Sequence, residues 1–363
     1  MKKIQLFLLN DVTGSMAPCF VQLRRNIITV GNGLSRDIPG LVLGVAALKD
    51  YCDDGSTYLY REQPFTPNFN QIHSFMEALS TGGGGDAPEA YEFGLHRAAE
   101  LKWDKGAEKL LVLCGDEVPH EASYPGNKLK LDWRKEAEKL AKLGVKIFAV
   151  QCLGNRHATA FYRDLAKITG GLHITLDQFR HIDLLVRGVA YAAAGPESLG
   201  RFEETVKADH KGVLTYGIAH ILDALAGRTT RDLTTLNGDL PDELEGFDVE
   251  PVPIGRFQAF DVVGEPSIKA FVQERGITFK KGRGFYPHVT RKETIQGYKL
   301  LVLEDLRTGR FFQGDGIREK LGIGTSDTRL DANPLPNFRL WVQSTSVNRV
   351  LRDPMFMYEA EEK

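Results

Sequence analysis

The sequence predicts a doubly wound α/β domain with a mainly parallel six-stranded sheet, followed by a smaller α+β domain. Over the first half of the 363 residues, short runs rich in leucine and β-branched residues alternate with longer segments in which apolar residues recur every three or four positions. That alternation is typical of a parallel sheet covered by helices on both faces. After about Phe247, aromatic and β-branched runs dominate, which indicates the α+β domain.

The expected elements of the first domain follow one another as strand and helix. We expect strands at Ile4–Leu9, Leu41–Ala47, Thr57–Tyr60, Leu110–Cys114, Lys146–Cys152 and His173–Leu176. We expect helices at Cys19–Asn32, Phe69–Leu79, Pro88–Leu101, Trp133–Leu143 and Ala158–Ile168. A last helix should begin at Asp177, which can cap it, and end at Gly195.

Composition divides the chain into three parts. Residues 1–195 form the first domain, residues 196–245 form a helical segment and a connector rich in glycine and polar residues, and residues 246–363 form the second domain. In the second domain we expect strands within 256–263, 299–306, 309–315 and 338–346, and helices at Ile268–Glu274 and Asp315–Leu321. No family resemblance is evident for the second domain.

The bulk properties favour a cytoplasmic protein. The net charge of −2 gives no overall attraction to nucleic acid or to anionic membranes. The apolar run before Asn10 is too short for a secretory signal, and no apolar stretch approaches the ~20 residues that span a bilayer. The four cysteines have no zinc-ligand spacing, and no Asn-x-Ser/Thr acceptor occurs. We therefore expect no membrane segment.

A loop with three oxygen-bearing side chains follows the first expected strand. Asp11, Thr13 and Ser15 alternate with Val12 and Gly14, and the glycine permits a tight turn. In open α/β sheets ligands bind beyond the carboxyl ends of the strands. Hard cations prefer oxygen ligands, and two neutral hydroxyls would leave such a cation seeking an anion. The loop is therefore a candidate metal site; the alternative interpretation of the same pattern is an Asx-turn or a helix N-cap without a metal.

Two further loops should lie beside it. Asp116 follows the strand Leu110–Cys114, and a glycine-rich loop carries Thr81, Asp86 and Glu89 just before a helix. Its four glycines give this loop freedom to approach an ion. The sequence thus predicts three loops that converge on one cation.

At these positions, residues 1–195 resemble the von Willebrand factor A family with its metal-ion-dependent adhesion site. The resemblance implies Mg²⁺ bound directly by Thr13 and Ser15, with Asp11 and Asp116 acting partly through water; Mn²⁺ and Ca²⁺ are the alternative ions. It also implies that a protein partner supplies a carboxylate to the ion. The neighbouring residues expected to touch that partner are Gly14, Met16, Gly85 and Glu117.

The third loop departs from the family pattern. The family's loop threonine is followed closely by a helix, whereas Thr81 precedes four glycines. Asp86 or Glu89 would then replace it, and Asp86 is preferred over Thr81. The loop also resembles that of the integrin β-subunit version of the domain, in which an acidic residue completes the metal site. Glu89 therefore stays among the candidate metal ligands.

Other functions are weighed against this one. A haloacid dehalogenase-like phosphatase needs a second carboxylate as general acid two positions after Asp11, where Thr13 stands. An enzyme whose chemistry lies in the second domain, with the first domain recruiting its substrate, is the alternative function. Lys280, Lys281 and Arg283 beside aromatic residues are candidate nucleic-acid contacts of a nucleoprotein component, the least favoured reading. His120, four residues after Asp116, is interpreted as a partly exposed loop histidine, with a second metal ligand as the alternative.

Overall fold

The structure is a computed structural model of the chain. It describes residues 3–85, 87–210, 212, 214–229, 240–252, 257–261, 286–287, 293–294, 301–322, 329–330, 335–342 and 355–359. The expected helix Ile268–Glu274 lies outside the described residues.

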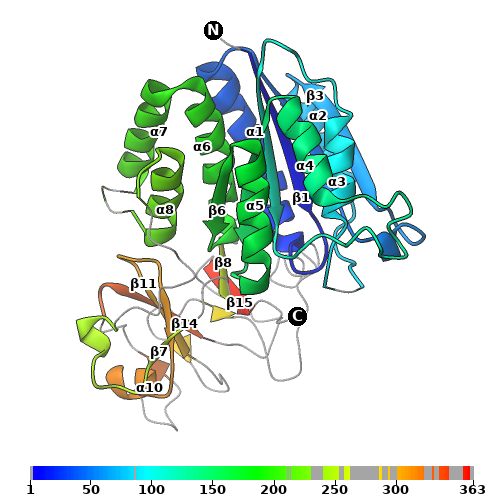
Figure 1. The fold of residues 1–363 in the computed structure, drawn as a ribbon. Coiled ribbons are helices and arrows are strands. Elements are labelled where there is room, and N and C mark those ends of the chain that lie inside the picture. The colour runs from blue at the N-terminus through cyan, green and yellow to red at the C-terminus, as the bar shows by residue number, and fades with distance from the viewer. Residues whose placement is uncertain are drawn as a thin grey trace.

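A six-stranded sheet runs through the first part of the chain (Figure 1). Its order is β3-β2-β1-β4-β5-β6, and all pairs are parallel except β2 with β3. The strands are β1 Ile4–Asp11, β2 Leu41–Leu48, β3 Tyr60–Thr66, β4 Glu108–Gly115, β5 Val145–Cys152 and β6 Leu172–Leu176. The predicted doubly wound, mainly parallel sheet is confirmed. Because the chain order reverses beside β1, the loops after β1, β2 and β4 meet at one edge.

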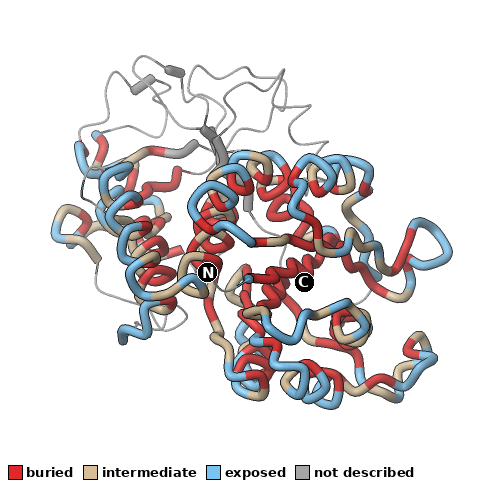
Figure 2. Tube along the Cα trace, turned by 90° about the horizontal axis from the view of Figure 1, so that it is seen from above, coloured by how far each residue is buried: buried red, intermediate tan, exposed pale blue. Residues whose placement is uncertain are grey.

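Helices cover both faces of the sheet and bury two apolar clusters. Strand residues alternate between them, as Leu6 and Leu8 join one cluster while Phe7 and Leu9 join the other. The first cluster packs against α1 Ala17–Asp37, α2 Phe69–Glu77 and α6 Ile182–Ala194. The second packs against α3 Tyr91–Ala99, α4 Trp133–Lys142 and α5 Thr159–Thr169. In Figure 2 buried residues run through the middle of the molecule and exposed ones follow the outer turns.

One expected strand was placed too early. We expected it at Thr57–Tyr60, but β3 begins at Tyr60 and continues to Thr66. The segment before it turns back on η1 Tyr51–Asp53, with the Thr57 N–H bonded to the Asp53 carbonyl at 2.8 Å. β3 is an antiparallel edge strand, where Pro64 is tolerated because one side of the strand needs no partner.

The segment after Gly195 is helical, as expected. α7 Pro196–Asp209 and α8 Tyr216–Leu225 pack against α6, and α8 also contacts β6. Besides η1, the short helices among the described residues are η2 Arg156–Ala158, η3 Phe179–His181 and η5 Asp242–Leu244. No helix among the described residues combines the length and apolarity needed to cross a bilayer.

The described strands of the C-terminal region pair antiparallel. The largest sheet there has the order β14-β11-β12-β7, and a second has the order β8-β15-β9. The elements are β7 Glu250–Pro251, β8 Phe257–Asp261, β9 Tyr286–Pro287, β10 Glu293–Thr294, β11 Leu301–Asp305, β12 Phe311–Gln313, α10 Gly316–Lys320, β13 Arg329–Leu330, β14 Phe338–Val342 and β15 Met355–Glu359. This region is bonded to the first one: Arg180 lies 2.7 Å from Glu304, and Gln258 bonds the backbone at Asp177 and Phe179.

Candidate functional site

The loop after β1 is folded around the Asp11 carboxylate. Asp11 ends the strand, and the Thr13 backbone N–H and hydroxyl both donate to its Oδ1 atom, at 2.9 and 2.6 Å. An aspartate that accepts from the second residue after it closes a turn of its own, which is the local fold that Asp-x-Thr favours. Asp11 and Thr13 are each 1% exposed. The turn therefore fixes both side chains in a buried setting.

Ser15 follows in the same loop. Its hydroxyl oxygen is buried and has no hydrogen-bond partner within the described part of the chain. Leaving a buried hydroxyl unsatisfied costs about 1–3 kcal/mol, so such a group calls for an explanation. Gly14, next to Ser15, is exposed. The loop is thus open to solvent at Gly14, and the Ser15 hydroxyl next to it makes no hydrogen bond with the described residues.

The glycine-rich loop is bonded to this turn by its backbone. The Gly14 N–H donates to the Gly83 carbonyl at 3.1 Å, and the Gly82 N–H donates to the Val12 carbonyl at 2.8 Å. Gly82, Gly83 and Gly84 all have positive φ, at +86°, +104° and +87°, which L-residues rarely adopt. The run of glycines is what lets the two loops lie against each other.

Gly84 lies between Glu89 and Thr13. A methyl group built on Gly84 would lie 3.3 Å from Glu89 Oε1 and 3.4 Å from Thr13 Cβ. Glu89 is 0% exposed, and its backbone N–H donates to the Val118 carbonyl at 2.9 Å in the loop after β4. Glu89 therefore stands at the junction of the three loops.

Tyr91 lies behind the three loops and connects them. Its hydroxyl donates to Asp11 Oδ2 at 2.6 Å and accepts from the Glu117 N–H at 3.3 Å. Burial raises the pKa of Tyr91 well above its ordinary value, and the negative charges of Asp11, Asp116 and Glu89 raise it further. The phenol thus stays protonated as a donor, and three carboxylates surround it.

Asp116 follows β4 at the same edge. It is 1% exposed, and its carbonyl accepts from Asn155 Nδ2 at 3.0 Å. Its charge acts on the hydroxyls of both Tyr91 and Tyr162, and burial is the main cause of the raised pKa of each tyrosine. Asp116 therefore belongs to the group of carboxylates around Tyr91.

The structure brings most of the expected metal-site residues together. Asp11, Thr13, Ser15, Glu89 and Asp116 lie on the three converging loops. Thr81 precedes Gly82 in the glycine-rich loop and is partly buried. Asp86 lies outside the described residues, as do the candidate nucleic-acid contacts Lys280, Lys281 and Arg283.

Two of the expected partner contacts are buried. Met16 is 0% exposed and packs in the core under α1, so we no longer expect it to touch a partner. Glu117 is also 0% exposed; His157 Nε2 lies 2.7 Å from its Oε2 atom. Gly14 and Gly85 are exposed, so they alone of the four expected partner contacts lie at the surface.

The interpretation of His120 as a partly exposed loop residue is wrong. His120 is 3% exposed, and its Nε2 atom lies 2.6 Å from Asp50 Oδ1. Its ring also stacks on Tyr124, with centroids 3.8 Å apart. The buried carboxylate of Asp50 explains the burial, because each group compensates the other.

Two residues of the site were missed from the sequence. The Asp53 carboxylate accepts from the Gly84 N–H at 3.0 Å and the Asp50 N–H at 3.3 Å, so it anchors the glycine-rich loop as well as its own turn. Tyr91 is the other. Asp53 stands two residues before Gly55 in a sequence typical of an ordinary turn, and nothing in the local pattern of Asp53 or of Tyr91 signals a contact so distant in sequence.

The oxygen atoms at this site are of the chemical kind that hard divalent ions take as ligands. Among the described residues, no group of three or more His, Cys, Asp and Glu side chains is arranged to hold a metal. An ion here would therefore depend on the hydroxyls of Thr13 and Ser15, with carboxylates in support. Mg²⁺ accepts such oxygen ligands and keeps several of its waters. The unused Ser15 hydroxyl beside the Asp11–Thr13 turn is consistent with that chemistry.

Comparisons with known proteins find distant structural similarity and no match in sequence. No protein-family model matches the chain, and no curated protein matches its sequence. Among solved structures, the crystal structure of the SpRpn10 VWA domain is similar at 16% sequence identity and a TM-score of 0.33, over 46% of this chain and 82% of that one. The doubly wound α/β fold follows from the sheet order and the helix layers.

Proposed function

We propose that the three loops at the carboxyl edge of the sheet bind Mg²⁺ and, through it, an acidic residue of a protein partner. The observation that carries the proposal is the buried Ser15 hydroxyl, which has no hydrogen-bond partner within the described residues and follows the Asp11–Thr13 turn. The resemblance of this loop to a metal-ion-dependent adhesion site supports it.

Each residue has a distinct role in this proposal. Thr13 and Ser15 hold the ion through their hydroxyls, while Asp11 orients Thr13 through the 2.6 Å hydrogen bond. Asp116 and Glu89 add negative charge from the neighbouring loops, and Asp86 or Thr81 is the alternative contribution from the glycine-rich loop. When bound, the ion supplies a positive charge that attracts a carboxylate. Gly14 and Gly85 border the exposed side where the partner would approach.

The proposed role is binding rather than catalysis. Both Asp11 oxygens accept hydrogen bonds, Oδ1 from Thr13 and Oδ2 from Tyr91. A carboxylate engaged in this way is a poor nucleophile, and Thr13 stands where a dehalogenase-like enzyme needs its general acid. We therefore propose a non-catalytic interaction module, and its cytoplasmic location stays a prediction.

A pull-down from native lysate tests this proposal. The tagged full chain is used with Mg²⁺, with a chelator, and as the Asp11→Ala variant; Asp164→Ala, at an exposed aspartate of α5, is the matched control. We expect a partner that is retained by the wild type and by Asp164→Ala with Mg²⁺, and that is lost with chelator or with Asp11→Ala. A partner that survives both losses would overturn the proposal.

A further inference from the structure

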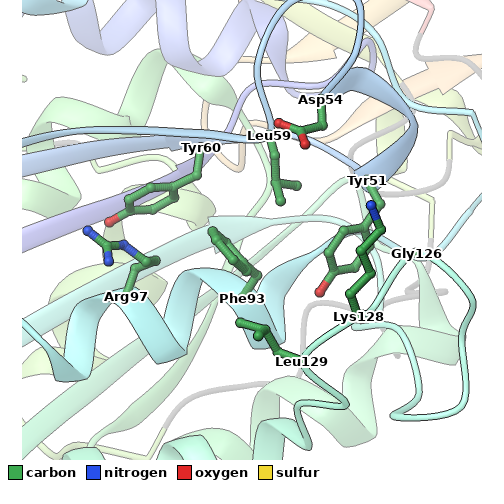
Figure 3. A pocket seen from close by; sticks show the side chains of 9 residues that line it. All are labelled: Tyr51, Asp54, Leu59, Tyr60, Phe93, Arg97, Gly126, Lys128 and Leu129. Atoms are coloured by element: carbon green, nitrogen blue, oxygen red, sulfur yellow. The ribbon is translucent and has the colours of Figure 1, made fainter.

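A cavity of about 590 Å³ lies beside the three loops that carry Asp11, Glu89 and Asp116, which we call the metal-site loops. Figure 3 shows the side chains that line it. Its apolar walls come from η1, the start of β3, α3 and the loop at 121–131. They are formed by Tyr51, Leu59, Tyr60, Phe93 and Leu129. The volume is of the order that takes a large side chain or a small ligand.

The walls of this cavity are fixed in place. The Tyr51 hydroxyl donates to Glu92 Oε1 at 2.7 Å, and the Tyr60 hydroxyl donates to Glu62 Oε2 at 2.6 Å. Both rings meet Phe93 edge to face, with centroids 6.4 and 5.9 Å away. A preformed aromatic surface loses little conformational freedom when it binds.

Leu129 is held at the mouth of the cavity with 61% of its surface exposed. It is the most exposed large apolar residue among those that the structure describes. The buried Asn127 fixes this turn, since it donates to the Leu131 carbonyl and accepts from the Leu131 N–H, both at 2.9 Å. Leu129 therefore extends the apolar surface of the cavity to its mouth, where an occupant would contact it.

The charges at the cavity favour an acidic group on the occupant. Arg97 is already paired, because it lies 3.4 Å from Glu62 and also contacts Glu100. Lys128 is exposed and has no ion-pair partner among the described residues. Asp54 also lines the cavity, so an acidic group of the occupant would have to face Lys128 rather than Asp54.

The cavity and the metal-site loops are built from the same segments. Tyr51 and Asp54 line the cavity, while Asp53 between them bonds the Gly84 N–H. At the start of α3, Tyr91 donates to Asp11 and Phe93 lines the cavity. The loop after β4 likewise leads from Asp116 to Leu129. A partner bound at the metal-site loops would therefore also contact this cavity.

From these observations we infer that the cavity binds a large apolar side chain of a polypeptide partner, with an acidic residue beside it that faces Lys128. That this is the same partner bound through the metal rests on the proposed function. The binding of the apolar side chain needs no metal.

Titration of short peptides onto the full chain, with its leucine methyl groups labelled for NMR and chelator present, tests the inference. The probe is acetyl-Asp-Trp-Asp-amide; acetyl-Asp-Ser-Asp-amide lacks the apolar side chain, and acetyl-Lys-Trp-Lys-amide reverses the charge. We expect the first to shift the methyl signals of Leu59 and Leu129, the serine peptide to bind at least about tenfold more weakly, and the lysine peptide to be several-fold weaker. Absence of shifts at Leu59 and Leu129, or equal binding of all three peptides, would overturn the inference.

Matched variants locate the binding. Leu129→Ser should weaken the tryptophan peptide about fivefold, while Leu143→Ser, which removes another exposed leucine on a different surface, should not. Lys128→Glu should weaken it and Lys135→Glu should not. Asp11→Ala should leave the titration unchanged, because it is run without metal. If the metal proposal is wrong, the peptide titration should still give these results. If the cavity does not bind the peptide, partner capture in the pull-down should still depend on Mg²⁺.

Discussion

Two regions of opposite chemistry share the carboxyl edge of the sheet. The metal-site loops gather buried oxygen atoms, with Asp11 and Thr13 each 1% exposed, around a tyrosine hydroxyl. The neighbouring cavity gathers aromatic and aliphatic side chains and exposes Leu129. The first is suited to an ion and a carboxylate, and the second to an apolar side chain. The comparison teaches that one set of loops can present both a polar and an apolar contact to a partner.

The two regions are joined by hydrogen bonds as well as by a shared core, since Tyr91 and Leu59 belong to one apolar cluster on which Phe93 packs. Glu92 accepts from the Tyr51 hydroxyl on the cavity side and from the His120 N–H in the loop after β4. Asp53 links η1 to the glycine-rich loop. Variants on each side should therefore separate the two functions, and variants of the links should affect stability as well.

The largest expected effect comes from Asp11→Ala. Mg²⁺ at about 100 times its dissociation constant should stabilise the wild type by about 3 kcal/mol, and this stabilisation should vanish in the variant. Thermal unfolding with and without Mg²⁺ measures it, with Asp54→Ala as the control that keeps the response. If the melting temperature of Asp11→Ala still rises with Mg²⁺ as in the wild type, Mg²⁺ does not bind at the loops that carry Asp11.

Glu92 should make stability depend on pH. Burial raises the pKa of Glu92 from 4.5 to about 7 in the folded chain. Between these values the unfolded chain releases the proton while the folded chain keeps it, so this group lowers stability as pH rises through the window. The loss is at most about 3 kcal/mol.

Glu92→Gln should remove that dependence. Relative to the wild type, the variant should gain stability as pH rises from 4.5 to 7, as measured by urea unfolding at several pH values. Glu100→Gln, at the exposed end of α3, is the control. A difference between wild type and Glu92→Gln that stays constant with pH would contradict the assignment.

Gly84→Ala should weaken the contact between the glycine-rich loop and the turn after β1. The φ of +87° disfavours a side chain, and the new methyl group would crowd Glu89 and Thr13. We expect a loss of about 1–2 kcal/mol in the free energy of unfolding, together with weaker Mg²⁺ binding. Gly55→Ala, where a methyl group would meet nothing within 4 Å, should cost much less. Equal effects of the two substitutions would show that Gly84 is not a special position.

Asp53→Asn should have the smallest effect of these. It keeps the shape of the side chain but removes the charge that strengthens the hydrogen bond from the Gly84 N–H. We expect a loss of about 1 kcal/mol, and calorimetric titration should show a several-fold weaker affinity for Mg²⁺. Asp54→Asn is the control. Unchanged Mg²⁺ affinity in Asp53→Asn would mean that this link does not support the metal site.

Much of the sheet could be predicted because its strands are buried on both faces. All eight residues of β1 are buried, and Leu6–Leu9 within it form an unbroken apolar run in the sequence. The edge strand β3 has only one buried residue, Thr66, and contains Pro64, so neither an apolar run nor alternation marked its position. The convergence of the loops followed from the strand order.

The details of the site could not be predicted because they are contacts between distant residues. Tyr91 and Asp11 are 80 positions apart, and Asp50 and His120 are 70 apart. A tyrosine near a helix start and a histidine in a loop have no local signature of such partners. The same holds for Asp53, whose carboxylate bonds a loop beyond the next strand and helix. The Asp11–Thr13 contact, by contrast, spans only two residues and lies within the motif itself.

The most direct test is a crystal structure of the full chain grown with Mn²⁺, with anomalous scattering used to locate the ion. We predict an anomalous peak in direct contact with the hydroxyl oxygens of Thr13 and Ser15, at about 2–2.5 Å from each. Crystals in which these two hydroxyls contact no anomalous scatterer, at Mn²⁺ concentrations that saturate the thermal response, would contradict the central claim.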